Sequence, residues 1–173
     1  MKRSEIQLPE YFDRYILMTD DVSVLDAFKI SLEELQSAPI EKWKAIHDKV
    51  YAPNKWTIKD ILQHLIDTEW TFSYRALAFA RGEKEARSYD ENEYAEMAHA
   101  TQRTIENLLE EAIALRKASI LLYQSFDEEM LSRKGMGFKG EYSVHAIGYI
   151  LCGHQRWHFK IIEERYMPLN VIS

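Results

Sequence analysis

The 173-residue chain contains one cysteine, Cys152, so no disulfide can form within it. Its six glycines and four prolines are too few for the many turns that a β-sandwich needs. The net charge is −6 and no run of lysine and arginine stands out, which argues against nucleic acids or anionic membranes as the main partners. No segment approaches the roughly 18 consecutive apolar residues of a membrane span. These absences leave an ordinary globular protein as the expectation.

The first residues, MKRSEIQLPEYFDRY, hold no apolar segment like that of a secretory signal peptide. With one cysteine and no visible export signal, the chain is expected to be cytoplasmic. Cys152 lies about 140° from Ile147 on a helical wheel, away from the histidines described below. It is therefore predicted to be a packing residue rather than a nucleophile or a metal ligand.

Four segments repeat apolar residues at spacings of three and four, the period of an amphipathic helix. They cover residues of about 21–37, 57–82, 101–126 and 143–166. Asp20 or Asp21 is expected to cap the first helix and Thr57 the second. No segment shows a sustained strand pattern. Four helices of matched length predict an all-α fold, a four-helix bundle that forms a single domain over residues 1–173.

The links between these helices differ in length. About 20 residues join the first helix to the second, and a similar number join the second to the third. The last link is shorter and holds Gly135, Gly137 and Gly140. A link of about 20 residues can return along the whole bundle, so the second and third helices can run parallel. Long crossover connections are therefore expected, rather than a simple up-down-up-down bundle.

Two histidines four residues apart, His154 and His158, stand out in the last helix. At about 100° per residue, both lie within about 20° of Ile147, at the centre of the apolar stripe. Imidazoles stacked in a core are poor packing groups but well placed as metal ligands. Hydrogen-bonded core histidines, or a chance surface pair, would have the same spacing. His145 lies about 160° from Ile147 and is expected to face solvent.

A reactive metal site usually takes three protein ligands and leaves one position open. His64, at the edge of the stripe on the second helix, is the candidate third ligand, although a lone histidine there is commonly a half-buried surface residue. Asp67 follows at i+3 and could orient His64, join the metal or act as a base. Gln155 follows His154, so the H-E-x-x-H motif of zincins is absent. The E-x-x-H pairs of di-iron bundles are absent as well, which favours a mononuclear site.

Three segments resemble the DinB-like superfamily of metal-binding four-helix bundles, including its YfiT-like branch. The second helix of that family, with its first histidine ligand and a following aspartate, resembles KWTIKDILQHLIDTEWTFSYRALAFARGE. The connection after it resembles YDENEY, residues 89–94, and the closing helix resembles SVHAIGYILCGHQRWHFKIIEERY. The order and spacing of the three are more specific than any one. The resemblance implies a crossover bundle with a three-histidine site, here His64, His154 and His158.

The resemblance also implies one divalent ion, nickel or zinc, and a homodimer. The family includes S-transferases that use bacillithiol, mycothiol or glutathione, and proteins classed as metal-dependent hydrolases. Trp157 stands where relatives often have another histidine and is predicted to wall the pocket. Residues 89–94 could cover the site as a lid, but a capping turn that leads into the third helix is the simpler interpretation.

Three functions stay open for this site. In the first, the ion activates a low-molecular-weight thiol, a co-substrate, for transfer to a small electrophile. In the second, it activates water for hydrolysis of an amide or ester. In the third, the bundle binds metal or dimerises without turnover. Glu69, Tyr74 and Arg75 are candidates for substrate contacts, although a solvated helix face is the simpler interpretation for Tyr74 and Arg75.

Overall fold

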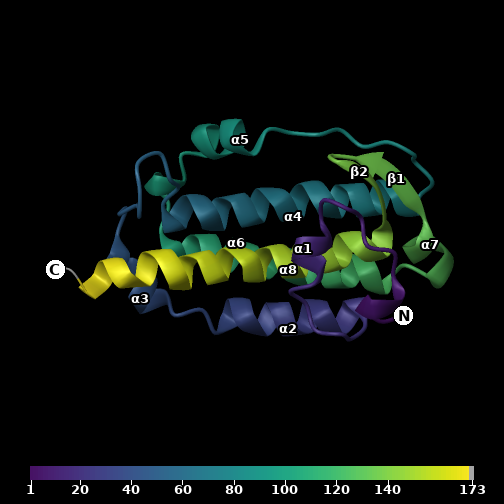
Figure 1. Ribbon diagram of the computed structural model, residues 1–173, viewed down its shortest axis with the longest axis horizontal. Helices are drawn as coiled ribbons and strands as arrows, with labels where there is room; N and C mark the ends of the chain where they lie inside the picture. Colours follow the sequence, from purple (N-terminus) through teal and green to yellow (C-terminus); the bar gives the residue numbers. More distant parts are fainter. Residues whose placement is uncertain (172–173) are drawn as a thin grey trace.

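The computed structural model describes residues 1–171, and helices make up most of it (Figure 1). Its four long helices are α2 (Val24–Gln36), α4 (Ile58–Ala80), α6 (Ile105–Gln124) and α8 (Val144–Ile161). The π-helix η3 (Ile162–Tyr166) continues α8. The four predicted helices are therefore confirmed. Within residues 1–171, no helix is both long and apolar enough to cross a membrane.

Short polar side chains determine where the long helices begin. Thr57 starts α4 as predicted, in a reciprocal capping box. The cap of α2 is Ser23, and the prediction of Asp20 or Asp21 was wrong by two or three residues. Asp21 instead accepts hydrogen bonds from the backbone and side chain of Ser4, and so ties down the N-terminal segment.

The four helices form a ring in which α2 and α4 each contact both α6 and α8. Hydrogen bonds between neighbouring helices show their directions. In two pairs of helices, a later residue of one helix bonds to a later residue of the other, so the two helices run parallel. One pair is α4 with α6, joined at Glu69–Arg116 and Ser73–Ser119. The other is α2 with α8, joined at Ser31–Gln155 and Glu34–Arg156. Because α4 and α6 are consecutive and parallel, the chain crosses over between them. The predicted crossover bundle is confirmed.

The crossover, residues 81–104, returns along α4 to the opposite end of the bundle (Figure 1). It carries α5 (Glu91–Ala98) and the short 3-10 helix η2 (Ala100–Gln102). At its start it pairs with a small hairpin, because the Ala86 amide donates to the Met136 carbonyl at 2.9 Å. The crossover thus lies over α4, the helix that carries His64.

The other links contain short elements. The first holds α3 (Ile40–Ile46), and the last holds α7 (Glu128–Ser132) and an antiparallel hairpin of β1 (Lys134–Gly137) and β2 (Gly140–Ser143). The hairpin was not predicted, because strands of four residues are too short to show a periodic pattern. It closes the end of the bundle at which α8 begins.

The N-terminal segment also adds elements that were not predicted: η1 (Arg3–Glu5) and α1 (Asp13–Ile16). Helix α1 packs on α8, where Gly153 lets the two backbones meet. A Cβ atom at Gly153 would lie 1.8 Å from the carbonyl oxygen of Tyr15, so no larger residue fits without moving α1. The contact places the Tyr15 ring beside the candidate site. A last 3-10 helix, η4 (Met167–Val171), follows η3.

Helix α8 is enclosed along its first three turns, and every residue from 144 to 155 is buried. His145 is only 3% exposed, so the prediction that it faces solvent was wrong. The wheel separated the two sides of α8 correctly, but the side that was expected to be free is packed: α7 contacts α8, and both Glu128 of α7 and the chain N-terminus lie near His145. Cys152 is buried, and burial raises the pKa of its thiol to about 12, which confirms it as a packing residue.

A buried ion pair joins α4 to α6. Both carboxylate oxygens of Glu69 accept from Arg116, at 2.8 and 2.9 Å, and Ser119 Oγ donates to the same carboxylate at 2.8 Å. Arg116 also donates to Ser31 on α2, whose hydroxyl donates to Gln155 on α8 at 2.9 Å. This network connects all four long helices.

Candidate metal centre

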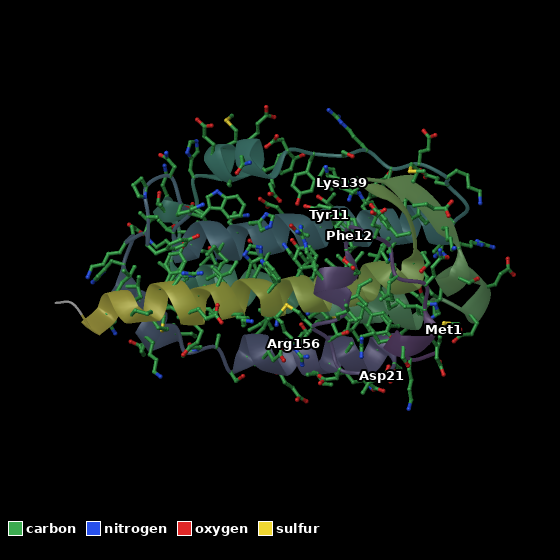
Figure 2. All side chains as sticks on the ribbon, in the orientation of Figure 1. Met1, Tyr11, Phe12, Asp21, Lys139 and Arg156 are labelled. Atoms are coloured by element: carbon green, nitrogen blue, oxygen red, sulfur yellow. The ribbon has the colours of Figure 1, made fainter. Side chains whose placement is uncertain are left out.

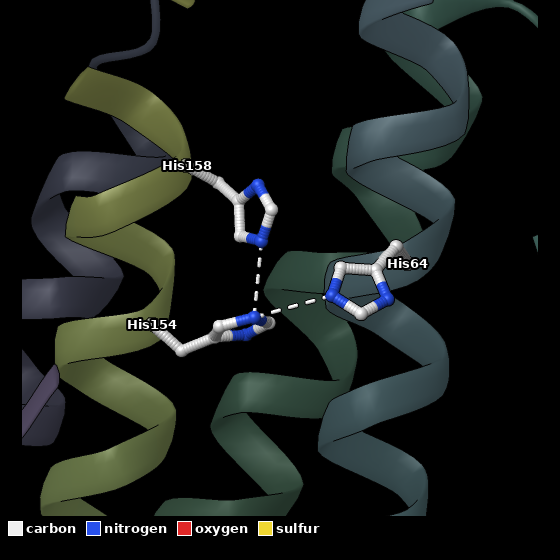
Figure 3. A group of neighbouring side chains, drawn as sticks. All are labelled: His64, His154 and His158. Carbon is white, nitrogen blue, oxygen red and sulfur yellow. Dashed lines mark hydrogen bonds between the residues drawn. The ribbon is translucent and has the colours of Figure 1, made fainter. Parts of the chain in front are cut away.

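Three histidines from two helices meet inside the bundle (Figure 3). His64 lies in the second turn of α4, and His154 and His158 lie one turn apart on α8. The Nε2 atom of His154 is 3.1 Å from that of His64 and 3.0 Å from that of His158. The three side chains are 4%, 6% and 9% exposed in chain order. The structure therefore brings together the three residues selected from the sequence.

Hydrogen bonding alone does not account for this convergence. An imidazole Nε2 carries either one hydrogen or one lone pair. His154 Nε2 can therefore complete a hydrogen bond with only one of its two close neighbours. A cation that accepts the lone pairs of all three nitrogens removes the conflict, and their ligand atoms all lie within 4.8 Å of one another. The donor set fits a single metal ion of the kind that imidazole binds.

The surroundings keep these imidazoles neutral. Burial lowers the pKa of His64 to about 3 and of His158 to about 4, and it holds the pKa of His154 well below its ordinary value. Repulsion by the neighbouring histidines acts in the same direction on His64 and His154. Neutral imidazoles have a free lone pair at physiological pH, as a metal ligand must.

Acid is expected to destabilise the metal-free protein. In the unfolded chain the histidines regain a pKa of about 6.5. Below that pH the unfolded chain binds more protons than the folded one, so the free energy of unfolding falls as the pH drops toward the folded pKa values of His64 and His158, about 3 and about 4. Urea denaturation with a chelator at about pH 7.5, 6 and 5 should give decreasing midpoints, with a shallower decrease in His64→Asn. Equal urea midpoints at all three pH values would contradict the conclusion that the three histidines are neutral in the folded protein.

Aromatic rings surround the three histidines. The Trp56 ring centroid is 4.8 Å from that of His64, and the Tyr15 ring meets His154 edge-on at 5.0 Å. His158 Nδ1 is buried without a hydrogen-bond partner, and within residues 1–171 no carboxylate hydrogen-bonds to the three rings. An ion bound here would keep its positive charge. The role of Tyr15 was missed, because α1 has only four residues and no periodic signal.

Asp67, the predicted base or orienting residue, makes its side-chain hydrogen bond with Gln63, whose Nε2 donates to it at 2.9 Å. Gln63 in turn accepts from Arg103 at 2.7 Å. Burial raises the pKa of the Asp67 carboxyl. Asp67 thus belongs to a polar network with Arg103, and its role as a base stays a prediction.

A pocket of about 200 Å³ reaches His64 and His154. Six aromatic side chains line it: Tyr11, Phe12, Tyr15, Phe72, Tyr89 and Phe138. Tyr11 and Phe12 lie on the hairpin side of the molecule (Figure 2), where Tyr11 packs edge-on against Phe138 at 5.6 Å. Trp157, which was predicted to wall the pocket, does not line it; its exposed ring packs edge-on against Tyr15 at 5.6 Å instead.

The crossover supplies the remaining wall of this pocket. Tyr89 shares a hydrogen bond of 2.8 Å with Thr68 on α4, and residues 89–92 all line the pocket. Asp90 also caps α5, where it accepts from the amides of Asn92 and Glu93. The segment predicted to be a capping turn is indeed one, but it caps α5 rather than the third long helix. It also covers the site.

A second pocket, also of about 200 Å³, reaches His158. Trp56 and Lys55 line it, and Asn92 borders both pockets. The three histidines can therefore be approached from two directions.

Among the predicted substrate-contact residues, Arg75 differs most from its expected place on a solvated helix face. Tyr74 is 57% exposed, as a solvated face requires, but Arg75 is 1% exposed and lines the first pocket. Arg75 lies eleven positions after His64, which is about 20° away on a helical wheel, so both lie on one face of α4. Thr68 and Phe72 belong to the same face. The spacing of Arg75 from His64 is the signal in the sequence that indicates its place on the pocket face.

Comparisons with known proteins show which family and which solved structure this architecture resembles. A family model described as the DinB superfamily matches residues 26–162. Among solved structures, YfiT from Bacillus subtilis superposes with a TM-score of 0.68 and 18% sequence identity, over 92% of this chain and 88% of that chain. YfiT is described as a probable metal-dependent hydrolase with an unusual four-helix bundle topology. At this identity the likeness concerns the fold. No curated protein matches the sequence.

Proposed function

Because the chain belongs to the DinB superfamily and carries three converging histidines, we propose that it is a metal-dependent enzyme whose divalent ion is held by His64, His154 and His158. The observation that carries this proposal is the approach of His154 Nε2 to both other nitrogens, at 3.1 and 3.0 Å. Zinc and nickel both suit imidazole ligands and are the proposed metals.

A divalent ion held only by neutral imidazoles keeps its full charge and lowers the pKa of a water molecule or thiol that it binds. The chain's own residues supply the surroundings. Tyr15 and Trp56 wall the histidines with apolar rings, which reduces the local dielectric and strengthens the field at the site. Tyr89 and Thr68 hold the crossover in place above it.

We propose S-transfer from a low-molecular-weight thiol to a small electrophile as the reaction. Two reactants need two approaches to the ion, and two pockets reach the histidines, one at His64 and His154 and the other at His158. The thiol has to come from outside, because the only cysteine is buried and its pKa is raised to about 12. Hydrolysis of an amide or ester is the second candidate, favoured by the description of YfiT.

The test compares metal-loaded protein without a histidine tag with the metal-free protein. With zinc or nickel bound, consumption of monochlorobimane by glutathione, cysteine or bacillithiol should exceed the metal-free rate by at least about tenfold. The loaded His64→Ala variant should give only the metal-free rate. No increase with any thiol, together with turnover of a p-nitrophenyl ester, would support the hydrolase instead. Metal binding without either activity would support a bundle that does not catalyse.

A further inference from the structure

We propose that the first pocket binds a small carboxylate with an apolar body, and that the Arg75 guanidinium holds its carboxylate group. This inference rests on the proposed function, since it assigns a substrate class to the same pocket. Arg75 would bind one end of the molecule and leave the other end facing His64 and His154.

The positive charge of Arg75 is buried without a counterion. Arg75 and Arg116 are both almost fully buried, at 1% and 2% exposed. Arg116 has the bidentate partner Glu69, whereas none of the ion pairs formed by residues 1–171 includes Arg75. A buried charge without a partner is costly, and proteins normally pair it. An anionic ligand would complete the pairing.

The hydrogen bonds of Arg75 leave donors unused. Nη1 donates to the hydroxyl of Tyr142 at 3.2 Å, and Nη2 donates to the carbonyl of Arg87 at 2.8 Å. Both acceptors are neutral, and Nε is buried with no partner at all. The guanidinium also stacks on Phe72, 4.5 Å from the ring centroid, which holds its plane. Since a guanidinium has five N–H donors in a fixed fork, an oriented cation with free donors lines the pocket.

The shape of the pocket indicates the rest of the ligand. Its floor runs along α4 from His64 through Thr68 and Phe72 to Arg75, three helical turns or roughly 16 Å along the axis. A cavity of ~150 Å³ can hold benzene, so about 200 Å³ suits a small aromatic or aliphatic acid. A single guanidinium matches the single charge of a carboxylate.

Two acidic residues, Asp90 and Glu91, also line this pocket. The Asp90 carboxylate is engaged by the amides of Asn92 and Glu93, and Glu91 is exposed on α5. Neither pairs with Arg75, so the guanidinium stays available. Their charges would disfavour a dianion more than a monoanion, which again favours a carboxylate over a phosphate ester.

The test measures binding to metal-free protein in the presence of a chelator, so that a preference for an anion cannot come from the ion. Calorimetric titration compares 3-phenylpropionate with its neutral analogue 3-phenylpropanamide. The carboxylate is expected to bind wild-type protein at least about tenfold more tightly than the amide. Arg75→Gln should abolish that preference and leave the amide affinity unchanged. Arg81→Gln, which removes an exposed arginine from the end of the same helix, should retain it.

Equal affinities of the two probes for wild-type protein would overturn the proposal, as would a preference that survives in Arg75→Gln. Tighter binding of 2-phenylethyl phosphate than of the carboxylate would overturn the assignment to a carboxylate. If circular dichroism shows that Arg75→Gln does not fold, Arg75→Lys replaces it and should weaken the preference, because lysine keeps the charge but not the fork. Because the test uses metal-free protein, its outcome does not depend on metal binding, so failure of the metal site and failure of the anion site are distinguishable.

Discussion

Replacing His154 with alanine is expected to abolish metal binding, with the affinity for zinc or nickel falling by more than about 100-fold. His154 is the middle member of the three, since its Nε2 is the atom close to both others. Without it, His64 and His158 remain on different helices as two separate ligands. The measurement is competition with a metal chelator, together with elemental analysis of protein purified without a histidine tag. The wild type should contain about one ion per chain.

The matched control is His145→Ala. His145 lies on the same helix and is as buried as His154, but it is not part of the triad. Its removal should leave the metal content unchanged. Equal loss in both variants would mean that any disturbance of α8 releases the ion, and full metal content in His154→Ala would contradict the ligand set.

Removal of one charge from the Glu69–Arg116 pair is expected to cost about 3–5 kcal/mol of stability. Both side chains are nearly fully buried, and both carboxylate oxygens of Glu69 are bonded to the guanidinium. Arg116→Met would leave the Glu69 carboxylate buried with only the Ser119 hydroxyl as a partner. Because the total stability of such domains is about 5–15 kcal/mol, this variant should be close to unfolding.

Urea denaturation of three variants checks this expectation. The double variant Glu69→Leu, Arg116→Met should recover most of the lost free energy, because no unpaired charge is left behind. The exposed pair Lys29–Asp26 provides the control, and Lys29→Ala should cost less than about 1 kcal/mol. A loss of the same small size in Arg116→Met, or no recovery in the double variant, would contradict the role given to the buried pair.

Much of the fold was predictable because the relevant signals are local. The apolar spacing identified the four long helices, and the length of residues 81–104 allowed α4 and α6 to run parallel. The i, i+4 spacing placed His154 and His158 on one face of α8. The position of His64 on the second helix made it the candidate third ligand, and the resemblance to the DinB superfamily, now confirmed, implied the same set of three. Homodimer formation, a cytoplasmic location and the identity of the metal stay predictions.

The features that the sequence did not predict depend on packing between distant segments of the chain. Nothing near His145 in the sequence shows that it is buried, and nothing near Tyr15 shows that it meets His154. Arg75 is buried next to the exposed Tyr74 because two distant segments cover it, the crossover through the carbonyl of Arg87 and the hairpin through the hydroxyl of Tyr142. A helical wheel gives directions around one helix, but the neighbours that occupy those directions are set by the whole chain.

X-ray absorption spectroscopy of the protein without a histidine tag, reconstituted with one equivalent of zinc or nickel, would identify the ligands of the bound ion. The three converging histidines predict a first shell with about three imidazole nitrogens, the rest being light atoms from solvent. A first shell with fewer than two imidazoles, or failure to retain the ion at all, would contradict a metal centre formed by His64, His154 and His158.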